Sequence, residues 1–275
     1  MTRLLQSSAG TNRRGFTWIE LLVVLVTISI LIALLFPALN ATKGASKRMT
    51  CTFNLKVFGL SMYGYHDKHK TLPSAQILGT NGKALHSWRM QLLPFLEKQN
   101  LYERLRFDEP WDSEHNMSLD LQNNYLQKCP IADKFRRKAK IDEKARWMLA
   151  DYQVVVGPQT PFERDRHTSF DAFERGMSNT YLVAEMTTAV PWFSPIDLPV
   201  ELLNCGVVAS SSGVRSVGSR HAGGANVLLA DGSTIFVSNS KSPQDIELLK
   251  TMFLLAEPKN NGSLAVTALP DNFEL

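Results

Sequence analysis

Residues 16–36 read FTWIELLVVLVTISILIALLF, a stretch of twenty-one residues in which Glu20 is the one charged side chain. As an α-helix this stretch would be about 30 Å long at about 1.5 Å per residue, enough to cross the hydrocarbon core of a bilayer. The preceding residues 1–15 carry Arg3, Arg13 and Arg14 and no acidic residue. The sequence therefore predicts a transmembrane helix with its N-terminus in the cytoplasm and the rest of the chain outside.

Glu20 sets this stretch apart from an ordinary targeting segment. A cleaved secretory signal peptide has a shorter apolar core followed by a small-residue cleavage site, and no such site precedes Pro37. A plain signal anchor would not carry a carboxylate five residues into its apolar run. A buried acid costs roughly 2.5–3.5 kcal/mol on insertion scales, so we expect Glu20 to have a partner and a function.

The pattern R-R-G-F-T-x-x-E before an apolar helix resembles the signal of type IV pilins and type II secretion pseudopilins. The matching residues are Arg13, Arg14, Gly15, Phe16, Thr17 and Glu20. The resemblance implies that a prepilin peptidase cuts after Gly15 and methylates the new amino terminus of Phe16. It also implies that Glu20 neutralises the amino terminus of a neighbouring subunit, because a paired buried charge costs much less than an unpaired one.

The overall composition excludes several classes of protein. With 44% hydrophobic and 20% charged residues, the 275-residue chain is neither disordered, collagen-like nor a coiled-coil rod. A mean hydropathy of −0.13 excludes a polytopic membrane protein. Removing the three arginines of residues 1–15 lowers the formal charge from +4 to +1, so the charge predicts no nucleic-acid partner.

The rest of the chain reads as a continued helix followed by a globular head. Apolar residues recur at helical spacing at Met49, Phe53, Val57, Leu60 and Tyr63. The prediction is one helix from about residue 16 to 69, with residues 16–36 in membrane or filament core and residues 37–70 amphipathic. Residues 71–275 would form the head, which gives an α+β, pilin-like fold with the helix packed on an antiparallel sheet.

The clearest local signals lie late in the chain. Residues 226–238 read NVLLADGSTIFVS, which predicts a hairpin with a type I′ turn at Asp231-Gly232. Ser242-Pro243 predicts the start of a helix that ends near Ala256. Further strands are predicted at 151–157 and 180–186, and two short helices within 87–105.

Beyond the N-terminal signal, the chain resembles a family of pilin-like proteins from planctomycete-type bacteria. These proteins carry an N-terminal methylation helix, a domain of unknown function (DUF1559) and a C-terminal H-X9-DG signature. The matching segments include Cys51, Tyr65-His66-Asp67, Ser87-Trp88-Arg89, Pro110-Trp111-Asp112, Cys129-Pro130, and His221 with Asp231-Gly232. Cys51 and Cys129 both lie in such segments, and export would permit disulfides. We therefore expect a Cys51–Cys129 bridge, the alternative being two small buried apolar residues.

No catalytic constellation stands out. His221 and Asp231 with Ser210–Ser212 would suggest a serine hydrolase, but the chain has no G-x-S-x-G motif and the turn explains Asp231. We expect His221 to be a hydrogen-bonded residue that fixes the chain before the hairpin. The basic run 134–146 reads as a solvated face.

The metal candidates are equally weak, so no metal or other cofactor is expected. His66 and His69 lack the third ligand that zinc requires. Calcium is the alternative, through acidic residues that lack EF-hand spacing. They are Asp108, Glu109, Asp112, Glu114 and Asp120.

Taken together, these patterns predict a non-enzymatic, pseudopilin-like structural subunit of a type II secretion or type IV pilus-like assembly. Its partners would be a prepilin peptidase, other pilin-like subunits and the inner-membrane assembly platform. The chain would be a single-pass protein of the inner membrane with a periplasmic or extracellular head. The alternative is a membrane-tethered module that binds a ligand or polymer, and a tethered hydrolase is the third hypothesis.

Overall fold

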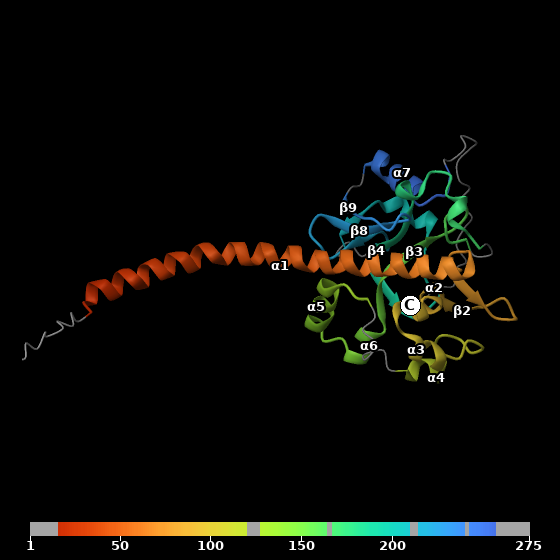
Figure 1. Cartoon of the computed structure of the whole chain (residues 1–275), viewed down its shortest axis with the longest axis horizontal. Coiled ribbons are helices and arrows are strands. Elements are labelled where there is room, and N and C mark those ends of the chain that lie inside the picture. The colour runs from red at the N-terminus through yellow and green to blue at the C-terminus, as the bar shows by residue number, and fades with distance from the viewer. Residues whose placement is uncertain (1–15, 120–126, 164–166, 210–213, 240–241, 257–275) are drawn as a thin grey trace, which may run out of the picture. The chain divides into compact units, whose positions relative to one another are not determined.

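The fold is that of a computed structural model, which describes residues 16–119, 127–163, 167–209, 214–239 and 242–256 (Figure 1). For residues 34–43, 204–205 and 209 it describes the backbone only. The chain divides into two compact units, residues 1–45 and 46–275. Helix α1 (Trp18–His69) runs through the boundary without interruption, close to the predicted bounds.

The first turn of α1 is closed by a capping box between Thr17 and Glu20. The Thr17 backbone N–H and hydroxyl both donate to Glu20 Oε2 at 2.8 Å, and the Glu20 N–H donates to Thr17 Oγ1 at 3.3 Å. These bonds satisfy donors that a helix N-terminus otherwise leaves free. The sequence T-x-x-E therefore has a local structural role as well as the predicted role in assembly.

The structure contradicts the prediction of a transmembrane helix. Among the described residues, no helix is long and apolar enough to cross a membrane. From Cys51 onward α1 is amphipathic, with one buried and one exposed face. The pilin-like fold with a membrane-spanning first half is thus not confirmed, whereas the α+β class is.

The head contains a five-stranded mixed sheet in the order β5-β3-β4-β8-β9. Its strands are β3 (Leu149–Val156), β4 (Tyr181–Pro191), β5 (Leu198–Pro199), β8 (Gly224–Leu229) and β9 (Thr234–Ser238). All neighbours pair antiparallel except β3 and β5, which pair parallel through Val155 and Leu198. The sheet is therefore mixed and not purely antiparallel as predicted, because the short β5 returns along the edge of β3.

The two faces of this sheet are covered by different helices (Figure 1). Val154, Val183 and Leu228 pack with the part of α1 that begins at Ser46, whereas Val155 and Val227 pack with α7 (Pro243–Met252) and the 3-10 helix η5 (Val200–Cys205). Alternation along each strand sends neighbouring side chains to opposite faces. The head is therefore a helix–sheet–helix sandwich.

The buried stripe of α1 is not the predicted one. Cys51, Leu55, Phe58 and Met62 are at most 1% exposed, at a spacing of three or four residues. The predicted stripe is largely solvent-facing, with Met49, Phe53 and Leu60 each at least 65% exposed. Both series fit a helical period, so only the sheet could decide between them. At Gly59 the helix comes so close to β8 that an added Cβ would lie 3.1 Å from Leu228.

The β8–β9 hairpin is confirmed, but its turn is not type I′. Gly232 has φ of +81°, whereas Asp231 is not among the residues with positive φ. The Gly232 N–H donates to Leu229 O at 3.1 Å and Leu229 N–H to Ser233 O at 2.9 Å, which leaves a three-residue loop with Gly232 as the left-handed residue. This is the type I turn with a glycine bulge, which needs one positive φ where type I′ needs two.

The remaining elements pack around this core. They are β1 (Gln76–Leu78), β2 (Ala84–Ser87), α2 (Trp88–Gln91), η1 (Leu93–Leu96), α3 (Gln99–Arg104), α4 (Glu114–Ser118), α5 (Pro130–Lys138), α6 (Glu143–Trp147), η3 (Phe170–Ala172), η4 (Met177–Asn179), β6 (Val208–Ala209) and β7 (Gly218–Ser219). Helix α7 begins at the predicted Ser242 cap, whose hydroxyl accepts from the Asp245 N–H at 3.1 Å.

Candidate functional site: a buried cluster of two cysteines, a histidine and a glutamate

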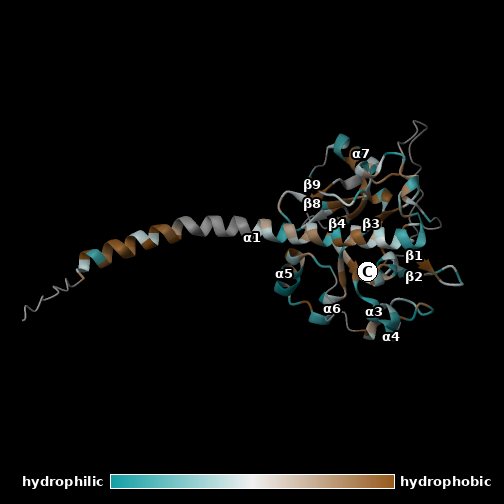
Figure 2. Ribbon diagram, viewed as in Figure 1, coloured by the Kyte–Doolittle hydropathy of each residue, from teal (hydrophilic) through white to brown (hydrophobic). Residues whose placement is uncertain are grey.

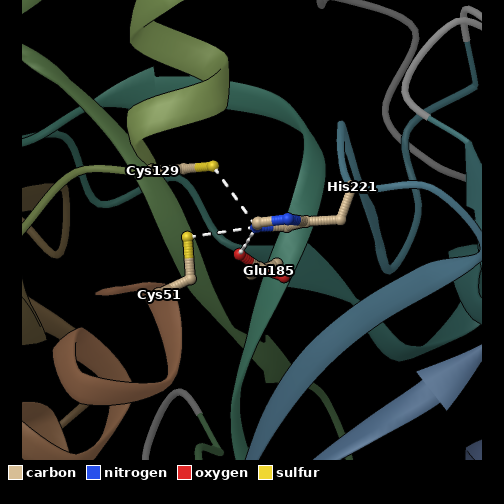
Figure 3. Close-up of side chains that lie close together, drawn as sticks. All are labelled: Cys51, Cys129, Glu185 and His221. Atoms are coloured by element: carbon tan, nitrogen blue, oxygen red, sulfur yellow. Dashed lines mark hydrogen bonds and ion pairs between the residues drawn. The ribbon is translucent and has the colours of Figure 1, made fainter. Parts of the chain in front are cut away.

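Four ligand-type side chains meet inside the head (Figure 3). They come from four separate segments: Cys51 from α1, Cys129 from the start of α5, Glu185 from β4 and His221 from the turn before β8. His221 Nε2 lies 3.2 Å from Cys51 Sγ, 3.9 Å from Cys129 Sγ and 3.4 Å from Glu185 Oε1. One ligand atom from each residue lies within 4.8 Å of all the others, and none of the four residues is more than 4% exposed.

The two cysteines are held by rigid elements. Cys51 begins the buried stripe of α1, and Cys129 is the N-cap of α5, with Pro130 in the first turn. The Cys129 N–H donates to Asp151 Oδ2 at 2.9 Å, and Arg136 pairs with the same carboxylate. Because Asp151 belongs to β3, this contact ties α5 to the sheet beside the cluster.

Glu185 points towards α1 because alternation in β4 places it on the same face as Val183. Its Oε2 accepts hydrogen bonds from Asn226 N at 2.7 Å and Asn226 Nδ2 at 2.8 Å. Within the described part of the chain, its buried Oε1 accepts no hydrogen bond and faces His221. Glu185 is therefore oriented by one oxygen and presents the other to the cluster.

His221 is fixed through its backbone. Its N–H donates to Ser219 Oγ at 3.0 Å, and the Ser219 hydroxyl donates to Gly224 O at 2.7 Å. These bonds close the turn between β7 and β8 and direct the imidazole inward. The expected role, a histidine that fixes the chain before the hairpin, describes this turn but not the side-chain partners.

The cluster favours a charge-separated state. Hydrogen bonds from Cys51 and His221 lower the pKa of Cys129 to about 6 although burial raises it. Burial lowers the pKa of His221, but its interactions with the side chains of Cys129 and Glu185 outweigh burial and bring the pKa to about 9. The hydrogen bond to Cys129 and burial raise the pKa of Cys51. Since His221 Nε2 lies nearer to Cys51 than to Cys129, the negative charge belongs to the pair of sulfurs, which titrate together.

A pocket of about 320 Å³ leads to the cluster. Its lining includes Cys129, Glu185, Asp151, Arg136, Thr187 and Arg220. Polar walls with both signs of charge allow a small hydrated ion to approach the two ligands that line the pocket.

The structure brings Cys51 and Cys129 together, as the predicted bridge requires, but both are free thiols. The disulfide therefore stays a prediction. Two thiols beside an imidazole and a carboxylate have two chemical options: oxidation to a disulfide, or coordination of a metal ion by deprotonated sulfur.

The two parts of the H-X9-DG pattern have separate places. His221 enters the cluster, whereas Asp231 and Gly232 form the hairpin turn, in which Asp231 Oδ1 accepts from the Ser233 N–H at 2.8 Å. The predicted turn role of Asp231 is thus confirmed. Ser210–Ser212 lie outside the described residues, so the structure does not test a catalytic triad with them.

The other sequence candidates do not gather into sites. His66 Nε2 lies 3.1 Å from Ser169 Oγ, and His69 stacks on Tyr65 at 4.3 Å, so each ring has its own contacts. Among the described residues, the four-residue cluster is the single group of three or more side chains placed to hold a metal, so Asp108, Glu109, Asp112 and Glu114 form none. Asp120 lies outside the described residues.

The basic run is partly engaged within the head. Asp133 pairs with both Arg137 and Arg146, and Arg136 pairs with Asp151. These ion pairs engage the three arginines of the run, while Lys134, Lys138 and Lys140 are exposed, as expected for a solvated face.

At the N-terminus, Gly15 lies outside the described residues, Phe16 is 71% exposed, and Glu20 makes the capping box. None of these observations tests processing or assembly, so both stay predictions.

Comparison with known proteins identifies a family but no characterised relative. The family described as a protein of unknown function (DUF1559) matches residues 40–198 and 193–244, most of the chain. The chain therefore belongs to the DUF1559 family. Its α+β head, packed against the part of α1 that begins at Ser46 and containing the buried cluster, is the structure of a DUF1559 protein. The matched residues include all four cluster residues and exclude Gly15, Phe16 and Glu20. No curated protein and no solved structure matches.

Proposed function

We propose that this protein is a pilin-like structural subunit, cut after Gly15 by a prepilin peptidase and assembled through the N-terminal part of α1. The observation that carries the proposal is the surface of residues 18–33, where large apolar side chains are exposed in every turn of helix. The ribbon of this part of α1 is mostly coloured as hydrophobic (Figure 2). Trp18, Ile19 and Leu31 are each at least 65% exposed. An apolar surface of this kind marks a binding surface.

We propose that other pilin-like chains pack against this surface. Burial of apolar area contributes roughly 25 cal/mol per Å², so helices bundled along residues 18–33 would bury enough surface to hold an assembly together. The assembly platform of the inner membrane would add subunits, and the head would lie outside the cytoplasm. The prepilin-type pattern from Arg13 to Glu20 supports this choice of partner.

Glu20 gives the sharpest test, because its two roles can be separated. Gln preserves a capping box but removes the charge, whereas Thr17→Ala removes the cap and keeps the charge. If Glu20 neutralises a neighbouring amino terminus, Glu20→Gln should reduce incorporation by at least about tenfold, the effect of 1.4 kcal/mol. Thr17→Ala is the matched control and should assemble nearly as well as wild type.

The measurement is the ratio of variant to wild-type chains in sheared filaments, divided by their ratio in whole cells, in a mixed-expression strain. A ratio near one for Glu20→Gln would overturn the role of Glu20. Mass spectrometry of the same material should find N-methyl-Phe16 at the terminus. An intact Met1 start in protein from the natural host would overturn the proposal as a whole.

A second candidate function is a ligand-binding head, favoured by a pocket of about 720 Å³. Aromatic and polar side chains share its walls, a mixture typical of ligand sites. Lining residues include Tyr65, Phe95, Tyr102, Phe107, Gln91 and His167. A polysaccharide that stacks sugar faces on these rings fits such a pocket.

Co-sedimentation with insoluble polysaccharide tests this second function. Tyr102→Ala should weaken binding, while Phe135→Ala, which alters a 47% exposed ring that does not line the pocket, should not. Equal binding by both variants and wild type would reject the pocket as a polymer site.

A further inference from the structure

We propose that Cys51, Cys129, Glu185 and His221 form a four-coordinate site for a divalent transition metal, Zn²⁺ by preference. This site is independent of the assembly function. It would join α1, α5, β4 and the turn before β8 at one point, so that the ion stabilises the head. The four side chains reach this point from four separate segments (Figure 3).

The spacing of the ligand atoms fits a tetrahedron. With Zn–S of about 2.3 Å, Zn–N of about 2.05 Å and Zn–O of about 2.1 Å, tetrahedral angles place N and O about 3.4 Å apart and N and S about 3.6 Å apart. The structure has His221 Nε2 at 3.4 Å from Glu185 Oε1, and at 3.2 and 3.9 Å from the two sulfurs. Small side-chain adjustments are therefore enough to surround an ion.

The donor set selects the ion. Two thiolates favour Zn²⁺, Cu⁺ or iron over Mg²⁺ and Ca²⁺, and imidazole with carboxylate suits Zn²⁺. Four protein ligands leave no open position, which is the pattern of structural zinc sites. The alternative of calcium in an acidic loop has no counterpart among the described residues, whereas this buried cluster has sulfur ligands that calcium avoids.

The surroundings already provide an outer shell of hydrogen bonds. Asn226 holds Glu185 Oε2 through two bonds, which leaves Oε1 turned inward, 3.4 Å from His221 Nε2. A buried carboxylate oxygen needs a cation or donor, which the imidazolium of His221 supplies in the metal-free protein and the ion would supply in its place. Asp151 holds the backbone of Cys129 in the same manner. Partners of this kind typically orient metal ligands.

Binding is a ligand exchange with balanced charge and protons. Zn²⁺ leaves its water ligands and gains two sulfurs, one carboxylate oxygen and one imidazole nitrogen. The thiol pair and His221 must together release the protons that they hold, because sulfur ligands bind as thiolates and imidazole binds as the neutral base. Affinity should therefore fall as the pH is lowered.

The first experiment uses the full-length protein, isolated under reducing conditions, stripped with a chelator and loaded with Co²⁺. One Co²⁺ per chain should bind and give intense visible ligand-field bands of tetrahedral geometry, with thiolate-to-metal charge transfer in the near ultraviolet. Zn²⁺ should displace it at one equivalent and raise the Tm of the stripped protein. Weak, octahedral-type Co²⁺ bands would overturn the proposal.

Ligand variants locate the site. Cys129→Ser and His221→Ala should lose the charge-transfer signature and tight binding, and Glu185→Gln, which keeps the shape of the side chain, should weaken Zn²⁺ binding more than about 100-fold. Asn226→Ala, which only supports Glu185, should weaken it about 10- to 100-fold. Cys205→Ser is the matched thiol control and should bind as wild type does.

Two further outcomes would contradict the site. Unchanged Co²⁺ spectra in Cys129→Ser and Glu185→Gln would move the metal elsewhere. Metal-free protein with a Cys51–Cys129 disulfide, found by peptide mapping of material taken anaerobically from the host, would show that the cysteines are a covalent bridge instead.

Discussion

Helix α1 contains two apolar regions, of which one is exposed to solvent and the other is buried. From residue 18 to 33 the large side chains other than Glu20 are apolar around the helix and solvent-facing, with Leu31 65% exposed. From Cys51 to Met62 a single narrow stripe is apolar and at most 1% exposed. One region has the composition of a surface that needs a partner, whereas the other already packs against the sheet in the core of the head.

This difference in exposure indicates that apolar residues have two different roles within one helix. The buried stripe contacts Tyr152, Trp88 and Leu228 and delivers Cys51 to the cluster. The exposed region begins with the capping box of Thr17 and Glu20, in a sequence that resembles a prepilin signal. Changes in the first region should therefore affect assembly alone, and changes in the second should affect the folding of the head.

The largest expected effect is on the buried stripe. Phe58→Ala should lower the free energy of unfolding of the head by about 3–5 kcal/mol, because it leaves a cavity between Trp88 and Tyr152. Leu60→Ala, two residues farther on but 75% exposed, is the matched control and should change it by less than about 0.5 kcal/mol. Denaturant unfolding measures both. Equal losses would mean that the buried face of α1 is assigned wrongly.

A smaller effect is expected where α1 meets the hairpin. Gly232 has φ of +81°, and a Cβ added to it would lie 3.4 Å from the ring of Tyr63. Gly232→Val should cost about 1–2 kcal/mol because a β-branched residue is strained at positive φ. Gly82→Val is a useful comparison, since Gly82 has φ of +75° but open space around it. A thermal unfolding curve for Gly232→Val equal to that of wild type would refute the glycine bulge.

Helix caps sharpen the comparison further. Ser242→Ala removes the cap of α7, which packs on the sheet, and should lower the stability of the head by about 1 kcal/mol. Thr17→Ala removes an equivalent cap from the exposed region and should leave unfolding of the head unchanged. The urea unfolding midpoints of the two variants measure these effects. A loss of stability in Thr17→Ala as large as that in Ser242→Ala would show that the exposed region contributes to the folding of the head.

The smallest expected effect is a pH plateau in the metal-free protein. The lowered pKa of Cys129, about 6 against an ordinary 9, gives stability that is present above pH 9 and lost as the pH falls through 6. The raised pKa of His221, about 9 against 6.5, gives stability that is present below pH 6.5 and lost as the pH rises through 9. Between about pH 6.5 and 9 the two pH dependences of stability cancel. In this range Cys129 and His221 together bind one proton in the folded state and one in the unfolded state.

Thiolate absorbance in the ultraviolet measures the folded state directly. In chelator-treated protein it should appear with a midpoint near pH 6 and be absent at that pH in Cys129→Ser. A single midpoint near 9 would show that neither sulfur is activated by His221.

The sequence predicts local structure well and long-range placement poorly. The extent of α1, the hairpin at Asp231-Gly232 and the Ser242 cap rest on signals within a few residues, and all three are found. The choice between the Met49–Leu60 series and the Cys51–Met62 series depends on the sheet, since both have helical spacing. The parallel edge strand β5 has two residues and leaves no periodic signal.

The cluster could be found from the sequence only in part. Cys51, Cys129 and His221 all lie in family-matching segments, and taken together they are a metal-ligand set. Considered separately, they predict a disulfide and a structural histidine. Glu185 sits within an apolar strand, YLVAEM, where a lone acid is itself a signal of a buried partner. The distance along the chain, 170 residues between Cys51 and His221, hides the rest.

Crosslinking in intact cells most directly tests the claim that residues 18–33 are a surface for other copies. Leu31→Cys should form crosslinked chains under a short bismaleimide reagent, in a ladder that exceeds the background of the native cysteines. Glu114→Cys, at an exposed site of α4 in the head, should give no more than that background. Adding Glu20→Gln to Leu31→Cys should remove the ladder while the head remains folded. Leu31→Cys chains that stay monomeric, or a ladder that survives Glu20→Gln, would contradict the account.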